Sequence, residues 1–262
     1  MLKILLTNDD GYDAIGLQVL IKALKPIAKV MVVAPARNKS ACGHSLTLER
    51  PLRLIGVDDD SYKVDDATPT DCIYLSLGNI FKNGYRPDLV ISGINIGANM
   101  GEDITYSGTA GGAMEAVLHG IPAIAISQVC KDRCKDISNN WDFKLAINTI
   151  ITLIEKIENG SFPLDERKFL NVNIPPINEE LCKGFKITKA GYREYGNDSD
   201  RHLNPRGEEF YWIGLHPLLW KESSDKSCDF EAIKDNFVSI SPIQLDMTSY
   251  NDIEKLENWL NK

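Results

Sequence analysis

The chain has 262 residues, of which 43% are hydrophobic and 25% charged, as in an ordinary globular protein. Its 29 lysines and arginines stand against 37 aspartates and glutamates, and the formal net charge of −8 gives no broad attraction for nucleic acid or an anionic membrane. The first residues lack the apolar region and cleavage site of a signal peptide, and no apolar run approaches the ~20 residues of a membrane span. We therefore expect a cytoplasmic protein that binds neither a nucleic-acid polymer nor a membrane. The six cysteines show no zinc spacing and are expected to be free thiols.

The first apolar run, residues 2–6, predicts a buried strand that ends shortly before Asp9 and Asp10. Two carboxylates about 4 Å apart repel by roughly 4 kcal/mol at an effective dielectric of 20, so such a pair favours a cation or a shared proton. Loops at the carboxyl ends of parallel strands also carry the ligand sites of open α/β sheets. The alternative is a plain turn in which one of the two aspartates caps the next helix.

Apolar residues at helical spacing predict a helix over 17–27, and the run 30–33 predicts a second strand. A strand, a helix and a parallel strand imply a right-handed crossover, so the loop 34–45 should emerge at the sheet edge that carries the two aspartates. Within this loop, Ser40 offers a neutral oxygen to a metal, and His44 is the only histidine near the expected site. The other polar residues of the loop can meet a phosphate or simply face solvent: Arg37, Asn38 and Lys39.

Short extended segments at 52–57 and 62–64 predict a hairpin. Thr68 begins the next helix as its cap, and Asp71 is placed to complete a capping box. The helix is expected to continue over 72–81. Its role is structural.

A third parallel strand is predicted at 89–92, and Asn95 lies just past its expected end, as Asp9 does for the first strand. The amide oxygen of Asn95 could therefore join the same cation. Ser107-Gly108-Thr109 begins a helix that ends near His119, and the N–H groups and hydroxyls at such a helix start make a natural phosphate seat. The alternative is that Ser107 or Thr109 only caps the helix.

The rest of the sequence first continues the alternation of strands and helices and then becomes more polar and irregular. Strands are expected at 123–127 and 169–174, and a long amphipathic helix between them at 143–157. Beyond residue 180 we expect an extended segment at 185–188 and a polar arm at 192–213 that ends in an aromatic strand. A late strand is expected at 237–240 and a terminal helix at 253–260. The predicted division is a catalytic core at 1–180 and a C-terminal region at 181–262 that is exchanged between subunits.

Taken together, Asn8-Asp9-Asp10-Gly11, the loop around Ser40 and the stretch from Ser92 to Gly112 resemble the SurE family, the survival protein family of metal-dependent nucleotidases. Further matching stretches run almost to the end of the chain: Thr68-Pro69-Thr70-Asp71-Cys72, Pro205-Arg206-Gly207 and Ile240-Ser241-Pro242. The resemblance implies a Rossmann-like three-layer α/β sandwich with a mostly parallel sheet, extended by a C-terminal hairpin and terminal helix that assemble homodimers or homotetramers. It also implies a 5′-nucleotidase that hydrolyses nucleoside 5′- and 3′-monophosphates, with polyphosphate as a further substrate of some members.

The resemblance also implies a site. One Mg²⁺ or Mn²⁺ per subunit would be held by Asp9, Asp10, Ser40 and Asn95, of which Asp9, Asp10 and Asn95 are expected to be catalytic. Phosphate would be bound by Asn8, Ser40, Asn95, Ser107, Gly108 and Thr109. Two departures from the family pattern concern loop shape: Ile15 stands where many members have proline, and Ala67 where many have glycine.

Three alternatives are considered for these residues: two catalytic mechanisms and one module without catalysis. In the first, water activated at the metal attacks phosphate in line while one aspartate relays the proton, with Asp9 preferred over Asp10. In the second, one of the two aspartates attacks phosphorus and forms an aspartyl-phosphate. The third is a receiver-type signalling module without turnover, which also has an acid pair after its first strand but needs a later strand-end aspartate that Ser92-Gly93-Ile94-Asn95 does not supply.

Overall fold

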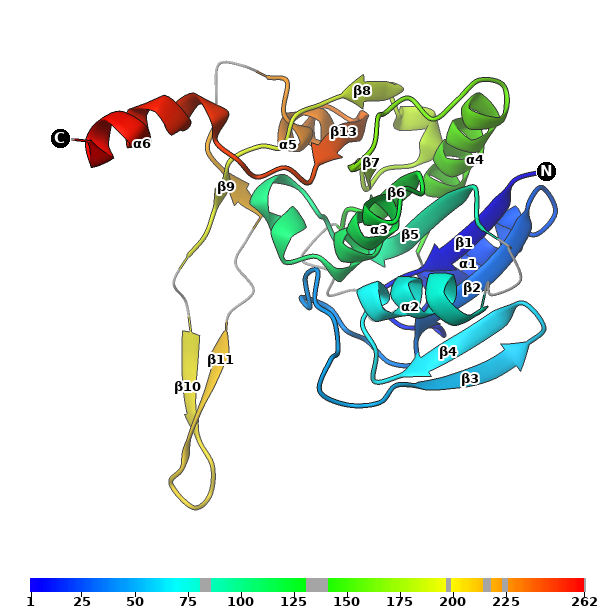
Figure 1. The fold of residues 1–262 in the computed structure, drawn as a ribbon, viewed down its shortest axis with the longest axis horizontal. Helices are drawn as coiled ribbons and strands as arrows, with labels where there is room; N and C mark the ends of the chain where they lie inside the picture. The colour runs from blue at the N-terminus through cyan, green and yellow to red at the C-terminus, as the bar shows by residue number, and fades with distance from the viewer. Residues whose placement is uncertain (81–85, 131–140, 197–198, 214–217, 223–225, 262) are drawn as a thin grey trace.

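The computed structural model of the chain describes residues 1–80, 86–130, 141–196, 199–213, 218–222 and 226–261 (Figure 1). Within these residues, a nine-stranded sheet has the order β3-β4-β2-β1-β5-β6-β7-β13-β8. Its strands are β1 (Lys3–Thr7), β2 (Lys29–Pro35), β3 (Arg53–Asp58), β4 (Ser61–Asp65), β5 (Leu89–Ile96), β6 (Ala123–Gln128), β7 (Lys168–Ile174), β8 (Phe185–Ile187) and β13 (Val238–Gln244). Neighbours from β4 to β7 pair in parallel, whereas β3 with β4 and β13 with β7 pair antiparallel.

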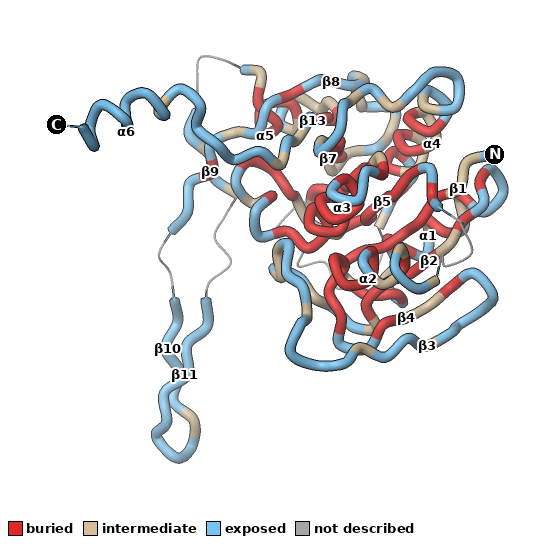
Figure 2. The backbone as a smooth tube through the Cα atoms, in the orientation of Figure 1, coloured by how far each residue is buried: buried red, intermediate tan, exposed pale blue. Residues whose placement is uncertain are grey.

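Helices cover both faces of the sheet and make three layers. On one face α1 (Ile15–Leu24) and α4 (Lys144–Glu158) bury their apolar sides, and on the other lie α2 (Pro69–Leu75) and α3 (Gly108–Leu118). Successive side chains of a strand point to opposite faces. Accordingly, Ile4 and Leu6 of β1 pack in the first cluster and Leu5 in the second, all fully buried (Figure 2). The predicted Rossmann-like α/β sandwich with a mostly parallel sheet is confirmed.

The order of the strands places a switch point beside β1. From β1 the chain first builds β2 and β4 on one side, and it then crosses to β5, β6 and β7 on the other. In open α/β sheets the ligand crevice lies outside the carboxyl ends of the strands at such a point. The site therefore belongs at the ends of β1 and β5.

Two local predictions about helices and strands need correction. The capping box at Thr68 and Asp71 is confirmed, but α2 ends at Leu75 and continues as a π-helical segment, η1 (Ser76–Ile80), while Phe81 lies outside the described residues. Strand β5 extends to Ile96, so Asn95 lies inside it rather than past its end. The pairing of β5 with β6 shifts register between Ser92 and Asn95, and this irregularity hides the continuation of the strand in the sequence pattern.

The C-terminal region contributes to the main sheet through β8 and β13, and its arm projects from the body (Figure 1). Its other strands are β9 (Arg193–Glu194), β10 (Ser199–Leu203), β11 (Glu209–Ile213) and β12 (Leu219–Trp220), and its helices are α5 (Asp229–Lys234) and α6 (Ile253–Leu260). Three short 3-10 segments complete the described elements: η2 (Gly101–Thr105), η4 (Glu179–Leu181) and η5 (Tyr250–Asp252). The division at residue 180 and the exchange of the arm between subunits stay predictions.

Two further expectations concern the cysteines and membrane spans. Cys42, Cys72, Cys182 and Cys228 carry free thiols, but Cys130 is disulfide-bonded, so the expectation of free thiols is wrong for Cys130. Among the helices of the described ranges, none combines the length and apolar character needed to cross a membrane.

Candidate functional site at the ends of β1 and β5

Asp9 follows β1 and is held by the start of α3. Its side chain is buried, and its Oδ1 accepts a hydrogen bond from the hydroxyl of Thr109. The backbone N–H groups of Gly108 and Thr109 also point at this carboxylate. Burial nevertheless dominates and raises the pKa of Asp9 above its usual value, because these hydrogen bonds offset only part of the lost hydration.

Asp10 is less buried and has fewer partners. The backbone N–H of Ile96 donates to its Oδ2 at 3.2 Å, which ties the end of β1 to the end of β5. Burial, and secondarily the charge of Asp9, raise the pKa of Asp10 to about 6. The two acids therefore form a strained like-charge pair, the arrangement that a bound cation would relieve.

The loop after β2 passes directly over Asp9. The N–H of Lys39 donates to the backbone carbonyl of Asp9 at 2.6 Å, and the exposed Ser40 is the next residue of the loop. The N–H of Ser40 in turn binds Oδ1 of Asn38 at 2.8 Å. Further along, the N–H of Gly43 donates to the carbonyl of Tyr106 at 2.9 Å, just before α3. The loop thus bridges the end of β1 and the start of α3.

Asn95 reaches the site from β5. Its Nδ2 donates to the carbonyl of Gly97 at 2.9 Å, so its amide oxygen points away from that carbonyl. Asn95 is 9% exposed, and the residue after it, Ile96, is the one that binds Asp10. Asn95 thus directly precedes the residue that binds Asp10, and its role at a cation stays a prediction.

At the start of α3, a side chain caps the helix and other chain segments pack closely against its backbone. Ser107 is the cap, and its Oγ accepts from the N–H of Ala110 at 3.0 Å, so the alternative role weighed for Ser107 is observed. A Cβ at Gly108 would lie 2.6 Å from Sγ of Cys42 and 2.8 Å from Cβ of Asp9. Glycine is therefore required at position 108 for three chain segments to meet. Neither this contact with Cys42 nor the bond from Thr109 to Asp9 has a signal in the sequence.

The donor set fits a hard divalent cation. Among the described residues, no group of three or more His, Cys, Asp and Glu side chains is arranged to hold a metal. Instead, the oxygens at this edge come from two carboxylates, a hydroxyl and an amide, the ligand types that Mg²⁺ and Mn²⁺ accept. Beside them, Oδ1 of the buried Asn8 has no hydrogen-bond partner within the described part of the chain, while its Nδ2 donates to the carbonyl of Gly11. A bound polar ligand, or a water molecule bound with it, would supply the hydrogen bond that this buried oxygen lacks.

Fold and site together define an open α/β protein with an oxygen-rich acidic centre at the switch point of its sheet. Residues 4–197 match the family model described as survival protein SurE. The protein named 5′-nucleotidase SurE from Aliarcobacter butzleri is 75% identical over 261 residues, covering 100% of both chains, and the protein of that name from Sulfurovum sp. is 60% identical over 260 residues, covering 99% of this chain and 98% of its own. A crystal structure of the SurE protein from Aquifex aeolicus superposes with a TM-score of 0.82 at 40% identity, covering 99% of this chain and 100% of its own. The chain belongs to the SurE family.

Proposed function

We propose that the protein is a metal-dependent phosphomonoesterase that hydrolyses nucleoside 5′-monophosphates to nucleoside and phosphate. The observation that carries the proposal is the pair Asp9 and Asp10 at the switch point of the sheet, where Asp9 contacts the start of α3, Asp10 is bound by the end of β5 and burial raises both pKa values. Membership of a family whose curated members are named 5′-nucleotidase supports the same reading.

The proposed cation ligands are Asp9, Asp10, Ser40 and Asn95, with one Mg²⁺ or Mn²⁺ per subunit. A bound divalent cation would lower the pKa of a water ligand from about 15.7 towards 7 and offset the charge of the phosphate. The chain's own residues supply positioning. The hydroxyl of Thr109 fixes Asp9, and the N–H of Ile96 fixes Asp10.

We assign the proton relay to Asp10, in place of the Asp9 preferred from the sequence. Asp10 is the more exposed of the two, and its Oδ2 accepts a hydrogen bond from the backbone N–H of Ile96. Asp9 instead has its Oδ1 engaged by Thr109. The amide of Asn95 and the side chain of Asn8 would orient the oxygens of the phosphate, and Ser107-Gly108-Thr109 would contribute the positive end of α3, since the N–H groups of Gly108 and Thr109 point at Asp9.

Several finer properties belong to the same proposal. Nucleoside 3′-monophosphates and polyphosphate are further proposed substrates, since both would present a phosphate group to the proposed cation. The proposed assembly is a homodimer or homotetramer, supported by the apolar side chains exposed on the projecting arm. Residence in the cytoplasm is proposed from the composition of the chain.

The proposal is tested by measuring phosphate release from a panel of nucleoside 5′- and 3′-monophosphates and polyphosphate, with Mg²⁺, with Mn²⁺ and with chelator. We expect multiple turnover of the 5′-monophosphates that the chelator abolishes and the metal restores. Asp9→Asn should abolish turnover while leaving the far-UV circular dichroism unchanged. Full metal-dependent activity in that variant would eliminate the mechanism.

Two rival schemes have their own tests. A receiver module would become stably phosphorylated by acetyl phosphate and would not turn over nucleotides; the lack of an aspartate in Ser92–Asn95 and the family both count against it. A single turnover in oxygen-18 water separates direct attack from an aspartyl-phosphate that is opened at carbon, although an intermediate opened at phosphorus would also label the phosphate. Direct attack by water labels the released phosphate, whereas an aspartyl-phosphate opened at carbon labels the enzyme.

A further inference from the structure

Outside the acidic pair, the described residues include a buried carboxylate held between two histidines. Glu115 lies on α3 and is 4% exposed. Its Oε2 is 2.8 Å from Nε2 of His44, and its Oε1 is 3.0 Å from Nε2 of His119. The two histidines thus occupy one carboxylate oxygen each.

The carboxylate of Glu115 is ionised in this arrangement. Burial alone would raise its pKa, but the hydrogen bonds and charges of His44 and His119 outweigh burial and hold the pKa below its usual value. An ionised carboxylate only accepts hydrogen bonds. Nε2 of both rings must therefore carry the donated proton, and each histidine removes part of the cost of a buried charge.

The two histidines differ in what they connect. His119 follows α3 directly and pairs with Glu115 four positions earlier, so its hydrogen bond stays within one helix. His44 belongs to the loop between β2 and β3, and its hydrogen bond spans 71 positions of sequence. Of the two histidine bonds, the one from His44 is therefore the one that joins the loop to α3.

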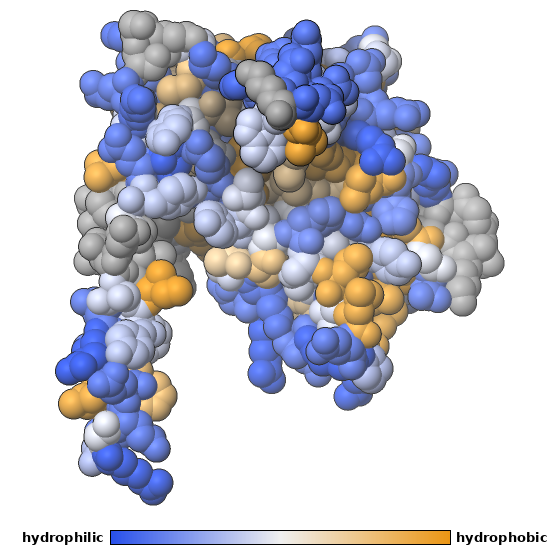
Figure 3. Space-filling view, turned by 60° about the vertical axis from the view of Figure 1, so that its left-hand side comes forward, coloured by the Kyte–Doolittle hydropathy of each residue, from blue (hydrophilic) through white to orange (hydrophobic). Residues whose placement is uncertain are grey.

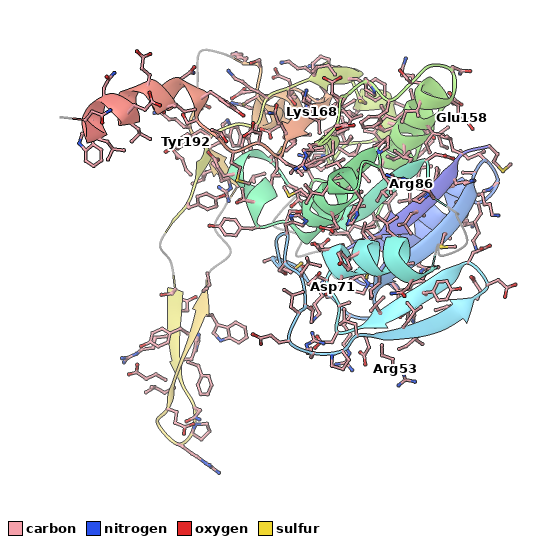
Figure 4. All side chains as sticks on the ribbon, in the orientation of Figure 1. Arg53, Asp71, Arg86, Glu158, Lys168 and Tyr192 are labelled. Atoms are coloured by element: carbon pink, nitrogen blue, oxygen red, sulfur yellow. The ribbon has the colours of Figure 1, made fainter. Side chains whose placement is uncertain are left out.

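That loop contains no helix or strand from residue 36 to residue 52, so side-chain anchors must fix its path. At its far end, Thr47 donates from its N–H at 2.8 Å and from its hydroxyl at 2.7 Å to Asp71, which is labelled at α2 in Figure 4. At its near end, the backbone of Lys39 binds Asp9. Between these anchors the loop presses on α3, where a Cβ at Gly111 would lie 2.5 Å from the carbonyl oxygen of Gly43.

We propose that His44 is a positioning residue, and that its bond to Glu115 holds Ser40 beside Asp9 and so sets the affinity of the site for its cation. The inference rests on the cation site proposed above. Ser40 is exposed; its N–H binds Oδ1 of Asn38, and the N–H of the preceding residue, Lys39, binds the carbonyl of Asp9. Where its hydroxyl lies therefore depends on the path of the loop, which the bond from His44 to Glu115 holds against α3. Groups that orient a metal ligand typically change metal affinity 10- to 100-fold when they are removed.

The structure offers a matched pair of variants, because His44→Ala and His119→Ala each remove one donor from Glu115. Mn²⁺ binding to the full chain is measured by titration of free Mn²⁺ with electron paramagnetic resonance, which does not depend on turnover. We expect His44→Ala to weaken Mn²⁺ binding roughly tenfold and His119→Ala to change it less than twofold. His44→Gln, which retains a long donor, should recover part of the loss, and the kcat at saturating Mn²⁺ should stay within twofold of wild type in both alanine variants.

A second measurement follows the loop without any metal. Amide hydrogen exchange of residues 38–47 should be faster in His44→Ala than in His119→Ala or wild type, with unchanged exchange in β1 and β5. Equal weakening of Mn²⁺ binding by both alanine variants would overturn the proposal, because the effect would then come from the charge of Glu115. Unchanged loop exchange in His44→Ala would also overturn it. A wild-type chain that binds no Mn²⁺ would contradict the proposed cation site. The hydrogen-exchange measurement alone would then test whether the bond from His44 to Glu115 holds the loop.

Discussion

The hydroxyl of Thr109 donates a hydrogen bond to Oδ1 of Asp9 across 100 positions of sequence. Both residues are buried, so the bond joins the end of β1 to the first turn of α3 without competition from water. Hydrogen bonds to charged groups are worth about 1.5–3 kcal/mol. One hydroxyl thus fixes the more buried acid of the site and lowers the cost of ionising it.

Removing this hydroxyl should disable the site with little effect on the fold. Thr109→Val keeps the shape of the side chain but leaves Asp9 without its side-chain donor, so its pKa should rise further. We expect kcat/KM for AMP to fall roughly 10- to 100-fold, which corresponds to the loss of such a bond. Thr109→Ser, which retains the hydroxyl, should remain within a few-fold of wild type. Equal losses in the two variants would contradict the role assigned to the hydrogen bond, because Thr109→Ser retains the hydroxyl.

Adding one methyl group at the start of α3 should separate the three segments that meet there. In Gly108→Ala the new Cβ would lie 2.6 Å from Sγ of Cys42 and 2.8 Å from Cβ of Asp9. Overpacking of this kind costs about 1–3 kcal/mol, so both the melting temperature and the activity should drop. Gly78→Ala is the control, because a Cβ at Gly78 meets nothing within 4 Å. A Gly108→Ala protein with wild-type melting and activity would contradict the close approach.

The raised pKa of Asp10 predicts a gain in stability on its removal. Folding raises the pKa from 3.8 to about 6, so the folded chain binds the proton more tightly than the unfolded chain does. The wild-type protein therefore loses stability as the pH rises from about 4 through about 6. Asp10→Asn stays neutral, and its Oδ1 can still accept from the N–H of Ile96. At pH 7 without metal, we expect this variant to melt roughly 2–4 °C above wild type, the shift that about 1 kcal/mol produces in a chain of this size.

The same comparison has a built-in control. At pH 4 the two melting temperatures should converge, since Asp10 is then protonated in the folded wild-type chain. Saturating Mn²⁺ should reverse the order at pH 7, because the cation stabilises only a folded state that can bind it. If wild type melts above Asp10→Asn at pH 7 in the absence of metal, the burial cost assigned to Asp10 is wrong.

Much of this site could be predicted from the sequence because its parts lie at strand ends. Apolar runs locate β1 and β2, and the right-handed crossover then brings the loop after β2 to Asp9, where the backbone of Lys39 binds it. Three features had no such signal. The register shift in β5 conceals that Asn95 lies within the strand, the bond from Thr109 to Asp9 depends on where α3 packs, and Glu115 meets His44 only because the loop folds back onto α3. Tertiary packing, which local patterns do not encode, decides all three.

The projecting arm carries apolar side chains that the chain itself does not cover. Phe210, Tyr211, Trp212 and Ile213 of β11 are between 53% and 87% exposed, and Figure 3 shows hydrophobic side chains among hydrophilic ones along this arm. An isolated two-stranded hairpin is marginally stable in water, so a second subunit is its expected partner. Trp212→Glu should therefore shift the assembly to smaller species in light scattering coupled to size exclusion, whereas Arg206→Glu at the exposed turn should not. A wild-type monomer would refute the assembly outright.

The most direct test of the account is the position of the cation. Crystals of the wild-type protein grown with Mn²⁺ should give one anomalous difference peak per subunit, within about 2.0–2.5 Å of oxygens from Asp9, Asp10, Ser40 and Asn95. A peak elsewhere, or well-ordered side chains of these four residues around no peak at saturating Mn²⁺, would contradict the account.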